Sequence, residues 1–446
     1  MNVKLIVILG GGESGVGAAI LAQKKGFRVF LSDSSRIKEK YRETLIQYNI
    51  DFEDGAHTDE KILKADEIIK SPGIPETLPI IKKIVDKGIQ LISEIEFAGR
   101  YSSAKHICVT GSNGKTTTTA LIYYILKSAG LNVGLAGNIG KSYARQVAEE
   151  NYDYYVLELS SFQLERMYDF KADIAVLLNI TPDHLDRHNY NLQDYIDAKM
   201  RIIHNQKIED SFIYWEDDPI VTREIEKLKP NASTYPFREF QSNYSAGYTE
   251  NGKIIINTNG TKFNMELELL ALEGIHNVYN SLASGIVARL MDVTDEQLRA
   301  SLSDFKGVPH RLEKVATVRG VQFINDSKAT NVNSCWYALQ SIRGRVVLIL
   351  GGTDKGNDYS EIEELVLKKV NALIFLGKDN SRLHQFFDEK VETIIDTESM
   401  TEAVEAAYKY SEKDDTVLLS PCCASFDLFD NYEDRGDQFK ECVRRL

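Results

Sequence analysis

The chain has 446 residues, of which 43% are hydrophobic and 27% charged, the composition of a globular protein with about three domains. Its net charge of -13 argues against a surface for nucleic acid or acidic membranes, so local basic residues must meet any anionic ligand. Five cysteines do not make a disulfide framework in this length, and no apolar stretch is long enough to span a membrane. We therefore expect a cytoplasmic protein with reduced thiols, no membrane insertion and no nucleic-acid partner.

The N-terminal segment predicts an α/β unit that binds a nucleotide. Val3 to Leu9 is an apolar strand, and Gly10-x-Gly12-x-x-Gly15 opens a helix after it. A second strand, Arg28 to Ser32, ends at Asp33, where a dinucleotide fold binds a ribose hydroxyl. Taken alone this pattern predicts NAD, but it is weak evidence because such a loop also marks other diphosphates and tight turns. Arg36 follows and could serve a phosphate or a base.

The same unit has a second candidate ligand edge. A strand at Ile68 to Lys70 runs into the turn Ser71-Pro72-Gly73, at the edge of the sheet where ligands bind. Leu91 to Ser93 supplies the last strand, and the domain is predicted to end near residue 97.

The strongest single motif is Ile107-Cys-Val-Thr-Gly-Ser-Asn-Gly-Lys-Thr-Thr-Thr-Thr119, which predicts a strand, a glycine turn and a helix. The glycines let backbone N–H groups converge on an anion, and the helix N-terminus adds its dipole. Lys115 supplies a charge for the β- and γ-phosphates, and the Thr116 hydroxyl can bind Mg²⁺. The general pattern has a glycine where Val109 stands, so this loop is a shortened variant. The alternative is a turn that merely contains Gly-Lys-Thr.

Two later strands end in polar residues. Tyr154 to Leu157 is followed by Glu158, and Ile174 to Leu178 is followed by Asn179 and then Thr181-Pro-Asp-His-Leu-Asp186. Strands that alternate with helices imply a parallel sheet, whose carboxyl edge would gather the phosphate loop, Glu158 and His184. A solvated strand end and a helix cap are the structural alternatives, but a carboxylate beside a phosphate loop favours Mg²⁺ binding.

Lys199 lies in the predicted helix 195–203, on the face that also carries Tyr195, Ile196, Ile202 and Ile203. Either its ammonium group reaches out to water, or it is a desolvated amine with a depressed pKa. Periodicity alone leaves these two alternatives open.

Residues 211–263 predict short strands and turns without evident chemistry. After them a helix starts at Gly274, and Asn277 and Asn280 share one face of its first turn. Capping of the helix and contacts from two amides to a base are both open.

A third alternating α/β unit follows Gly307-Val-Pro-His-Arg311, which has the look of an interdomain linker. Its strands are expected near 322–324, 346–350, 373–376, 393–395 and 417–419. Their ends carry Asn325-Asp-Ser-Lys-Ala-Thr-Asn331, Gly351-Gly-Thr-Asp-Lys-Gly356 and Ser420-Pro-Cys-Cys-Ala-Ser-Phe-Asp427. Lys328 and Lys355 could be plain surface lysines, but their placement at strand ends favours one basic ligand edge.

The three units together favour an enzyme that joins a nucleotide-linked carboxylate to an amine. A dehydrogenase does not need the phosphate loop, and a simple kinase does not need the N-terminal unit. Two other classes stay open. An NAD(P)-dependent oxidoreductase would bind nicotinamide without hydrolysing ATP, and a regulatory nucleotide-binding module would show no ATP turnover with any amino acid.

Seven motifs, in order along essentially the whole chain, resemble those of the Mur ligases of peptidoglycan synthesis. They are Gly111–Thr117, Glu158-Leu-Ser-Ser-Phe-Gln163, Asn179–Asp186, His276-Asn-x-x-Asn280, His310-Arg311, Asn325–Asn331 and Asp354-Lys355-Gly356. Within the family, Asn325–Asn331 and Ser420–Asp427 are similar to the branch that adds D-glutamate. The last domain has no Asp-Asn-Pro-Arg motif, which the branch that adds diaminopimelate or lysine would show. Folylpolyglutamate synthetases share the later two domains but lack this N-terminal one.

The resemblance implies an α/β fold of three domains, each a mainly parallel sheet with flanking helices. These would be an N-terminal Rossmann-like domain for the UDP substrate (1–97), a central P-loop ATPase-type domain (98–304) and a C-terminal Rossmann-like domain for the amino acid (305–446). It also implies a monomeric, cytoplasmic ligase whose partners are the small molecules UDP-N-acetylmuramoyl-L-alanine and D-glutamate. ATP would convert the substrate carboxylate to an acyl phosphate, which the D-glutamate amine would attack, with release of ADP and phosphate. Two Mg²⁺ ions and Lys115 would offset the repulsion between the anions.

Matched residue by residue, the family's motifs imply a site with four groups of residues. The ATP contacts are Gly111, Ser112, Asn113, Gly114, Lys115, Thr116, Thr117, Asn277, Asn280, Arg311 and Asp326. The metal ligands are Thr116, Glu158, His184 and Lys199, the last as a carbamate formed with CO₂, and Lys115, Glu158, His184 and Lys199 are the catalytic residues. The UDP-substrate contacts are Ser14, Gly15, Val16, Asp33, Ser34, Arg36, Ser71, Gly73, Asn138 and Gln163. The D-glutamate contacts are Lys328, Thr330, Lys355, Ser425, Phe426 and Tyr432.

Two departures from the family's pattern bear on these assignments. The family often has alanine where Cys422 or Cys423 stands, a change that we expect to be neutral. The N-terminal loop is richer in glycine than usual and carries Glu13, whose side chain we expect to point away from the diphosphate.

Overall fold

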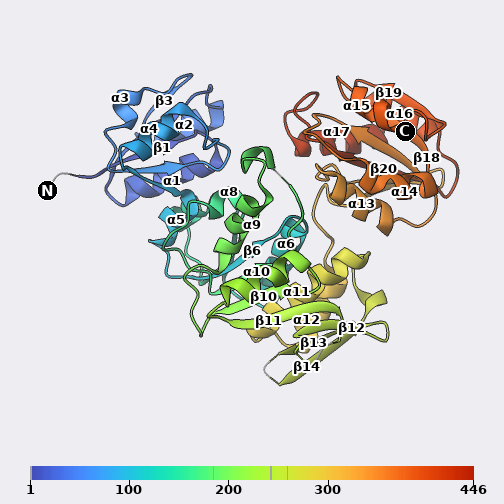
Figure 1. Cartoon of the computed structure of the whole chain (residues 1–446), viewed down its shortest axis with the longest axis horizontal. Coiled ribbons are helices and arrows are strands. Elements are labelled where there is room, and N and C mark those ends of the chain that lie inside the picture. Colours follow the sequence, from blue (N-terminus) through green and yellow to red (C-terminus); the bar gives the residue numbers. More distant parts are fainter. Residues whose placement is uncertain (1–2, 184, 242–243, 259) are drawn as a thin grey trace. The chain divides into compact units, whose positions relative to one another are not determined.

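The computed structural model describes residues 3–183, 185–241, 244–258 and 260–446. The chain divides into two compact units, one of residues 1–270 with 279–305 and one of residues 271–278 with 306–446. The first unit contains two β-sheets and the second contains one, and helices flank each sheet (Figure 1). Most neighbouring strands are parallel, which confirms the predicted α/β class.

The first sheet is wholly parallel, with the strand order β3-β2-β1-β4-β5 (Figure 1, blue). Its strands are Leu5–Leu9 (β1), Arg28–Asp33 (β2), Asp51–Asp54 (β3), Glu67–Lys70 (β4) and Gln90–Ser93 (β5). Its helices are Glu13–Lys24 (α1), Glu39–Gln47 (α2), Asp59–Ile62 (α3), Pro79–Asp86 (α4) and Glu94–Gly99 (α5). The strand order reverses direction between β1 and β4, and at such a switch point the carboxyl ends of the strands leave a crevice for ligands.

The second sheet has the order β14-β13-β12-β11-β10-β9-β6-β8-β7, with antiparallel pairing only from β12 to β14 among its described strands. Its strands are Lys105–Thr110 (β6), Val133–Gly137 (β7), Tyr154–Glu158 (β8), Ile174–Leu177 (β9), Ser211–Trp215 (β10), Ser233–Phe240 (β11), Gly247–Glu250 (β12), Lys253–Thr258 (β13) and Thr261–Glu266 (β14). The helical segments are Lys115–Ser128 (α6), Tyr143–Glu149 (α7), Ser161–Leu164 (α8), Leu185–Arg187 (η1), Leu192–Met200 (α9), Arg201–Ile203 (η2), Pro219–Leu228 (α10), Leu267–Leu269 (η3), Ile275–Leu290 (α11) and Asp295–Asp304 (α12). β6 lies between β8 and β9 and is parallel to both, so the residues that follow these three strands lie at one edge of the sheet.

The third sheet has the order β15-β16-β20-β17-β18-β19, and only β15 and β16 pair antiparallel. Its strands are Glu313–Val318 (β15), Val321–Asn325 (β16), Val346–Gly351 (β17), Val370–Leu376 (β18), Ile394–Thr397 (β19) and Thr416–Cys422 (β20). Its helices are Val332–Ser341 (α13), Ser360–Lys369 (α14), Ser381–Phe387 (α15), Met400–Lys409 (α16) and Tyr432–Arg444 (α17). Because β17 and β20 are buried along their whole length, both faces of the sheet are covered, as in other parallel sheets.

The expectation of only strands and turns in 211–263 was wrong for one segment. Residues Pro219–Leu228 form the helix α10. Asp218 caps it by accepting hydrogen bonds from the backbone N–H groups of Ile220 and Val221, and Pro219 occupies the first turn. An acidic residue followed by proline is a known helix start, so the sequence did carry the signal.

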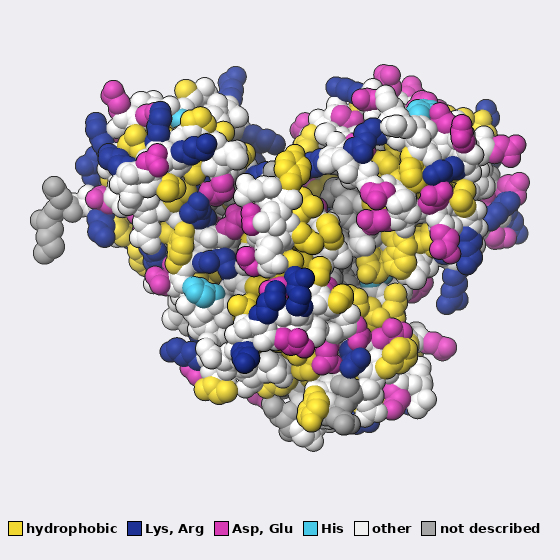
Figure 2. Space-filling model, viewed as in Figure 1, with side chains coloured by type: hydrophobic (Ala, Val, Ile, Leu, Met, Phe, Trp, Pro, Cys, Tyr) yellow, Lys and Arg dark blue, Asp and Glu magenta, His cyan; other side chains and the backbone are white. Residues whose placement is uncertain are grey.

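Within the described residues, no helix is both long and apolar enough to cross a bilayer. On the face shown in Figure 2, acidic and basic side chains are interspersed with scattered hydrophobic ones. Local groups, rather than a patch of one sign on this face, must therefore attract an anionic ligand.

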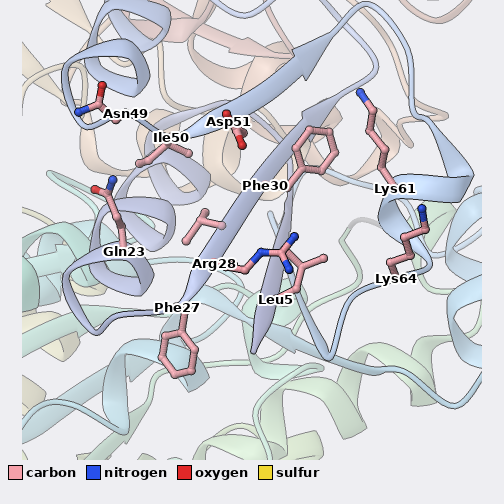
Figure 3. Close-up of a pocket in the computed structure, with 11 residues that line it drawn as sticks. Leu5, Gln23, Phe27, Arg28, Phe30, Asn49, Ile50, Asp51, Lys61 and Lys64 are labelled. Atoms are coloured by element: carbon pink, nitrogen blue, oxygen red, sulfur yellow. The ribbon is translucent and has the colours of Figure 1, made fainter. Parts of the chain in front are cut away.

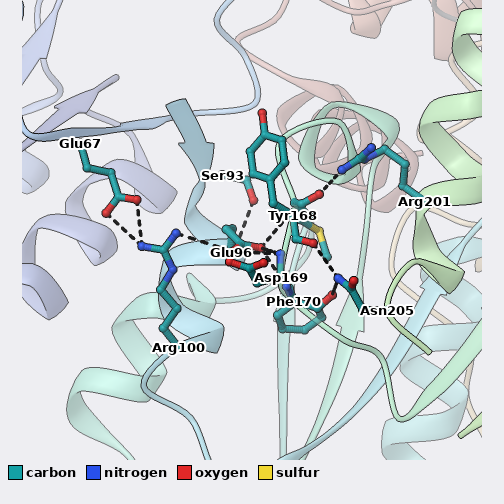
Figure 4. A network of polar contacts seen from close by, with 10 residues as sticks. Glu67, Ser93, Glu96, Arg100, Tyr168, Asp169, Phe170, Arg201 and Asn205 are labelled. Atoms are coloured by element: carbon teal, nitrogen blue, oxygen red, sulfur yellow. Dashed lines mark hydrogen bonds and ion pairs between the residues drawn. The ribbon is translucent and has the colours of Figure 1, made fainter. Parts of the chain in front are cut away.

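Helix α5 ties the first sheet to the second through two buried carboxylates. The carboxylate of Glu96 accepts hydrogen bonds from the backbone N–H groups of Tyr168, Asp169 and Phe170, the shortest at 2.9 Å (Figure 4). Glu94 Oε1 accepts from the hydroxyl of Ser142 and from the N–H of Ala144, both at 2.7 Å. Acidic groups that satisfy backbone donors across a boundary fix the relative position of the two sheets.

The second of these carboxylates should make stability depend on pH. Glu94 is 2% exposed, and burial raises its pKa from 4.5 to about 7, with the charge of Glu13 acting in the same direction. The native state therefore holds this proton more tightly than the unfolded chain. The resulting stabilisation is complete below about pH 4.5 and is lost as the pH rises through 7.

We predict that Glu94→Gln, which mimics the protonated side chain, removes this pH dependence. The free energy of unfolding of the variant relative to the native chain should rise between pH 5 and pH 8, on the order of 2 to 3 kcal/mol. Urea unfolding at several pH values measures the difference. Glu149→Gln is the control, because the pKa of that carboxyl is lowered rather than raised. A difference that stays constant from pH 5 to pH 8 would contradict the assignment.

Candidate functional site

The phosphate loop lies between β6 and α6, as the sequence predicts. Gly114 immediately precedes α6 with φ +83°, a conformation that only glycine adopts easily. A Cβ atom at this position would lie 2.5 Å from Asn280 Oδ1. The glycine is thus required both by the backbone conformation and by the close approach of α11.

Asn179, at the end of β9, holds the loop in place. Its backbone carbonyl accepts a hydrogen bond from the Ser112 N–H at 2.9 Å. Its side chain accepts from the Asn113 N–H at 2.8 Å and donates to the Asn113 carbonyl at 3.1 Å. The Ser112 hydroxyl donates to the Thr181 carbonyl at 2.8 Å and lies 3.0 Å from the hydroxyl of Tyr195. The segment after β9 and helix α9 therefore fix the loop from one side.

Two lysines converge on the same backbone carbonyl. The ammonium group of Lys115 donates to the carbonyls of Gly111 and Ser112, both at 2.8 Å. Lys199, from α9, donates to the carbonyl of Gly111 at 2.7 Å. Two positive charges at one oxygen repel each other, which favours the neutral form of the more buried amine.

Lys199 is that more buried amine. It is 1% exposed, and its Nζ lies 4.6 Å from the centre of the Tyr195 ring. Burial, assisted by the charge of Lys115, holds the pKa of Lys199 well below its usual value of 10.5, while Asp183 and Glu158 act in the opposite direction. Of the two alternatives left by the sequence, the structure supports the desolvated amine.

Glu158, the last residue of β8, lies at the same edge and is also 1% exposed. Its Oε1 accepts a hydrogen bond from the side-chain amide of Asn138 at 2.9 Å. Its Oε2 is buried and has no hydrogen-bond partner. A buried carboxylate oxygen without a donor is costly, and a cation would satisfy it.

The other predicted metal ligands are placed only in part. Thr116 is buried in the first turn of α6, and His184 lies outside the described residues. Elsewhere in the described ranges, no three His, Cys, Asp or Glu side chains gather as a metal site. The predicted partners of Glu158 in a cation site are the Thr116 hydroxyl, His184 and a modified Lys199.

Asn280 lies against the phosphate loop. Its Oδ1 accepts a hydrogen bond from the Thr118 hydroxyl at 3.1 Å, and the residue is 5% exposed. Asn277 belongs to the segment 271–278, and its side-chain amide donates to the Glu273 carbonyl at 2.7 Å. The structure therefore brings Asn280 to the loop, while the amide of Asn277 makes a local contact near the start of α11.

At the carboxyl edge of the first sheet, Asp33, Ser71 and Gly15 from the predicted UDP-substrate group lie against the turn after β1. Asp33 accepts from the N–H groups of Gly11 at 2.6 Å and Ser35 at 2.8 Å, so its carboxylate orders the turn itself. The hydroxyl of Ser71 is buried and has no hydrogen-bond partner, which leaves it available to a ligand. A Cβ atom at Gly15 would lie 1.9 Å from the carbonyl oxygen of Gly10, so packing against the strand requires this glycine.

The remaining predicted residues of this group differ in exposure. Ser34, Arg36, Gly73 and Asn138 are exposed, Ser14 is half-buried, and Val16 and Gln163 are buried. Gln163 belongs to a capping box at the start of α8, where its side chain accepts from the backbone N–H of Ser160. The carboxylate of Glu13 accepts from the Ser142 N–H at 3.2 Å, so it is used in packing against α7.

A cavity of about 390 Å³ lies at the opposite end of the first sheet (Figure 3). Leu5, Arg28 and Asp51, which line it, are the first residues of β1, β2 and β3. In parallel α/β sheets ligands bind at the carboxyl ends of the strands, so this cavity is not where the sequence places the nucleotide.

In the second unit, the loop after β16 is held by buried polar groups. Asp326 is 2% exposed and accepts from the Ser420 hydroxyl at 3.0 Å and from the Leu312 N–H at 3.2 Å. Burial raises the pKa of Asp326 to about 6, and the nearby charge of Arg311 opposes that rise. Lys328 lies with its ammonium group 5.0 Å from the centre of the Tyr432 ring.

In this unit, the residues predicted to bind the amino acid follow the ends of three strands. Lys328 and Thr330 follow β16, Lys355 follows β17, and Ser425 and Phe426 follow β20. Lys355 and Thr330 are exposed, Ser425 is buried, and Phe426 is 70% exposed. Asp354 orders the loop of Lys355 by accepting from the N–H groups of Gly356 and Asn357.

Arg435, from α17, joins these three loops and was not found from the sequence. It is 1% exposed, and its guanidinium donates to the carbonyl of Ser327 at 2.8 Å, that of Cys423 at 3.2 Å and that of Gly351 at 3.5 Å. Burial lowers the pKa of Arg435 to about 10, so it remains charged at neutral pH. One buried cation thus fixes the loops that carry Lys328, Lys355 and Ser425.

Three other residues that sequence reasoning did not assign are Asn179, Tyr195 and Asp183. The sequence placed Asn179 at a strand end, but nothing local indicates that it pairs with Asn113. Tyr195 was placed on the same helix face as Lys199, and that spacing was the available signal for its contact with the lysine. The charge of Asp183 acts on the pKa of Lys199, and no spacing in the sequence indicates that proximity.

Comparisons with known proteins agree along the whole chain. Residues 4–93 match the family model described as Mur ligase MurD-like, N-terminal domain, residues 109–288 match the Mur ligase middle domain, and residues 310–423 match the Mur ligase glutamate ligase domain. A UDP-N-acetylmuramoylalanine–D-glutamate ligase of Bacteroides fragilis is 62% identical over 444 residues, which cover 99% of this chain and 100% of that protein. The protein of the same name from Porphyromonas gingivalis is 59% identical, covering 99% of this chain and 98% of its own.

Solved structures show the same fold at low identity. The UDP-N-acetylmuramate–alanine ligase of Thermotoga maritima is 16% identical, with a TM-score of 0.65 and full coverage of both chains. A pseudomurein peptide ligase type C from Methanothermus fervidus is 23% identical, with a TM-score of 0.61 and 99% coverage of each chain. At these identities the likeness establishes the fold only.

We predict that Gly114→Ala disables the phosphate loop. The new methyl group would meet Asn280 in addition to the strain of a positive φ. Binding of MgATP, measured by calorimetry, should weaken at least tenfold. The control is Gly130→Ala, which has φ +88° but no atom within 4 Å of the added Cβ, and which should lose about 1 kcal/mol of stability without loss of MgATP binding. Equal MgATP affinity in the two variants would contradict the assigned role of Gly114.

Proposed function

The chain belongs to the Mur ligase family, and we propose that it joins D-glutamate to UDP-N-acetylmuramoyl-L-alanine at the expense of ATP. The names of relatives that are 62% and 59% identical over nearly the whole chain support this choice of substrates. The observation that carries the proposal is the edge of the second sheet. There a phosphate loop, a buried carboxylate with an unpaired oxygen and a desolvated lysine meet at the ends of β6, β8 and helix α9.

The chemistry explains why such an edge is needed. A carboxylate oxygen of the sugar-nucleotide substrate attacks the γ-phosphorus of ATP, the bond to the β-phosphate oxygen breaks, and ADP leaves. The amine of D-glutamate then attacks the carbonyl carbon of the acyl phosphate, the C–O bond to phosphate breaks, and the nitrogen loses a proton. The first step brings two anions together, so positive groups must be in place before the chemistry begins.

Residues of the phosphate loop supply much of this environment. Helix α6 begins directly after Gly114, and a helix N-terminus favours an anion through its unpaired N–H groups and its dipole. Lys115 lies folded over the carbonyls of Gly111 and Ser112, where its charge faces the loop. Asn280, packed against the loop, and Asn277, Arg311 and Asp326 are proposed as further contacts to ATP.

The residues present fit a divalent cation. Glu158 offers a buried oxygen that lacks a donor, and Thr116 offers a hydroxyl beside the loop. We propose that Thr116, Glu158, His184 and Lys199 hold two Mg²⁺ ions, which when bound would neutralise phosphate charge. Lys199 would take part as a carbamate, since addition of its Nζ to CO₂ requires a neutral amine and gives an anionic ligand.

D-Glutamate is assigned to the three loops that Arg435 joins in the second unit. Its carboxylates are proposed to bind Lys328, Thr330, Lys355 and Ser425, with Phe426 and Tyr432 as apolar walls. The buried charge of Arg435 adds positive potential beneath these loops. The UDP substrate is assigned to the switch point of the first sheet, around the buried hydroxyl of Ser71.

We further propose three functional domains, 1–97, 98–304 and 305–446, in a monomeric enzyme of the cytoplasm that acts in peptidoglycan precursor synthesis. The described residues provide no membrane-spanning helix, and the substrates are small and water-soluble.

The proposal predicts ADP release only when both acceptor and amine are supplied. With UDP-N-acetylmuramoyl-L-alanine, Mg²⁺ and ATP, release should be at least a hundredfold faster with D-glutamate than with L-glutamate, D-alanine or lysine. A coupled ADP assay measures the rates.

A second experiment replaces D-glutamate with hydroxylamine. A hydroxamate of the substrate should form, because hydroxylamine intercepts the acyl phosphate. Preference for another amino acid would overturn the substrate assignment, and the absence of both ADP and hydroxamate would overturn the reaction.

A further inference from the structure

His188, in the turn after η1, is a buried histidine that the proposed reaction does not use. It is 2% exposed. Its Nδ1 lies 3.0 Å from Glu165 Oε1, and its Nε2 lies 3.1 Å from the hydroxyl oxygen of Ser161. Because a carboxylate only accepts hydrogen bonds, Nδ1 carries a proton and donates to Glu165, while Nε2 contacts the Ser161 hydroxyl. Both partners belong to α8 or its first following residue, so the ring orientation is fixed from that helix.

The faces and edges of the same ring are also occupied. The Phe162 ring stacks on it at a centroid distance of 5.4 Å and an interplanar angle of 10°. The Tyr195 ring meets it edge to face, at 5.2 Å and 68°. Aromatic pairs in these two arrangements have defined geometry, so a fixed imidazole fixes the tyrosine beside it.

Tyr195 in turn contacts both halves of the candidate site. Its ring centre lies 4.6 Å from the Nζ of Lys199, and its hydroxyl lies 3.0 Å from the Ser112 hydroxyl in the phosphate loop. The same Ser112 oxygen accepts from the Thr181 N–H at 2.9 Å. Tyr195 alone therefore lies between His188 and the phosphate loop.

We propose that His188 is a positioning residue for the phosphate loop, acting through Tyr195. By locking the Tyr195 ring against α8, it holds the tyrosine hydroxyl on Ser112 and the tyrosine face over Lys199. The inference rests on the proposed function only in assuming that this loop binds MgATP or MgADP. A displacement of about 1 Å in a loop that contacts phosphate is enough to cost two orders of magnitude in rate.

The competing explanation is a histidine that merely packs in the core, and His106 offers the matched comparison. It is also buried, it lies 2.6 Å from the Tyr143 hydroxyl, and it contacts the rings of Tyr143, Tyr155 and Phe170. It stands near the start of β6, whereas the phosphate loop follows the end of that strand. Its replacement therefore measures the general cost of losing a buried, hydrogen-bonded imidazole.

The test uses the full chain with three variants. His188→Phe keeps an aromatic ring between Phe162 and Tyr195 but loses both hydrogen bonds. His188→Gln keeps a donor for Glu165 and an acceptor for Ser161, so it should retain MgADP binding and activity. His106→Phe is the control. The readouts are the Kd for MgADP by calorimetry, kcat with all substrates, and the unfolding temperature, and binding is measured at least 10 °C below unfolding.

We expect His188→Phe to weaken the binding of MgADP at least fivefold and to lower kcat at least tenfold. His188→Gln should stay within threefold of the native Kd and kcat. His106→Phe should lower the unfolding temperature but leave the Kd for MgADP within twofold. The inference is overturned if His188→Phe leaves both Kd and kcat within twofold, or if His106→Phe weakens MgADP as much. Failure of the native chain to bind MgADP would instead count against the proposed function.

If His188→Phe fails to fold, Ser161→Ala replaces it in the test, because it removes one hydrogen bond of the imidazole. Ser161→Ala must then weaken the binding of MgADP at least twofold, and an unchanged Kd overturns the inference.

Discussion

The carbonyl oxygen of Gly111 accepts hydrogen bonds from Lys115 and Lys199, at 2.8 and 2.7 Å, and the chemistry of the site depends on this shared acceptor. Two ammonium groups cannot both be charged at one buried oxygen without a large cost, because each lowers the stability of the other's charge. Burial is the main cause of the lowered pKa of Lys199. Lys199 lies in α9, where it is buried beside the ring of Tyr195, whereas Lys115 directly follows the phosphate loop as the first residue of α6. Lys115 is therefore the lysine proposed to meet phosphate, and Lys199, with its lowered pKa, the one proposed to react as an amine.

In the second unit, a buried basic side chain also donates to backbone carbonyls, but its role differs from that of Lys199. Arg435 donates to the carbonyls of three strand-end loops, just as Lys199 donates to the carbonyl that closes the phosphate loop. A guanidinium keeps its charge when buried, and the pKa of Arg435 falls only to about 10, whereas an ammonium loses its charge more readily. The same type of contact thus gives a permanent structural cation in one unit and a potentially reactive amine in the other. Removing Arg435 would leave buried carbonyls without this donor, whereas without Lys199 the Gly111 carbonyl would still accept from Lys115.

The sequence predicted those parts of the fold that have a strong local signal. Apolar runs such as β1, β8 and β17 are central parallel strands and were placed within two residues of their observed ends. The strands β3 and β15 were missed because both are edge strands in which no residue is fully buried and polar residues interrupt the apolar ones, which removes the apolar signal. In the site, the phosphate loop and the strand end at Glu158 follow from sequence because each lies beside its own strand. The pairing of Asn179 with Asn113 and the reach of Arg435 to Ser327 and Gly351 do not, because these contacts join residues 66 or more positions apart through tertiary packing.

The central claim is that burial holds the pKa of Lys199 well below its usual value of 10.5. The direct measurement is the titration of its side chain by NMR in protein labelled with ¹³C at lysine Cε, with CO₂ excluded and with a Lys199→Arg sample to assign the signal. The structure predicts a pKa well below the usual 10.5, and a new carbamate signal when ¹³CO₂ is admitted at pH 8. Titration of Lys199 near 10.5, together with the other lysines, would contradict the account.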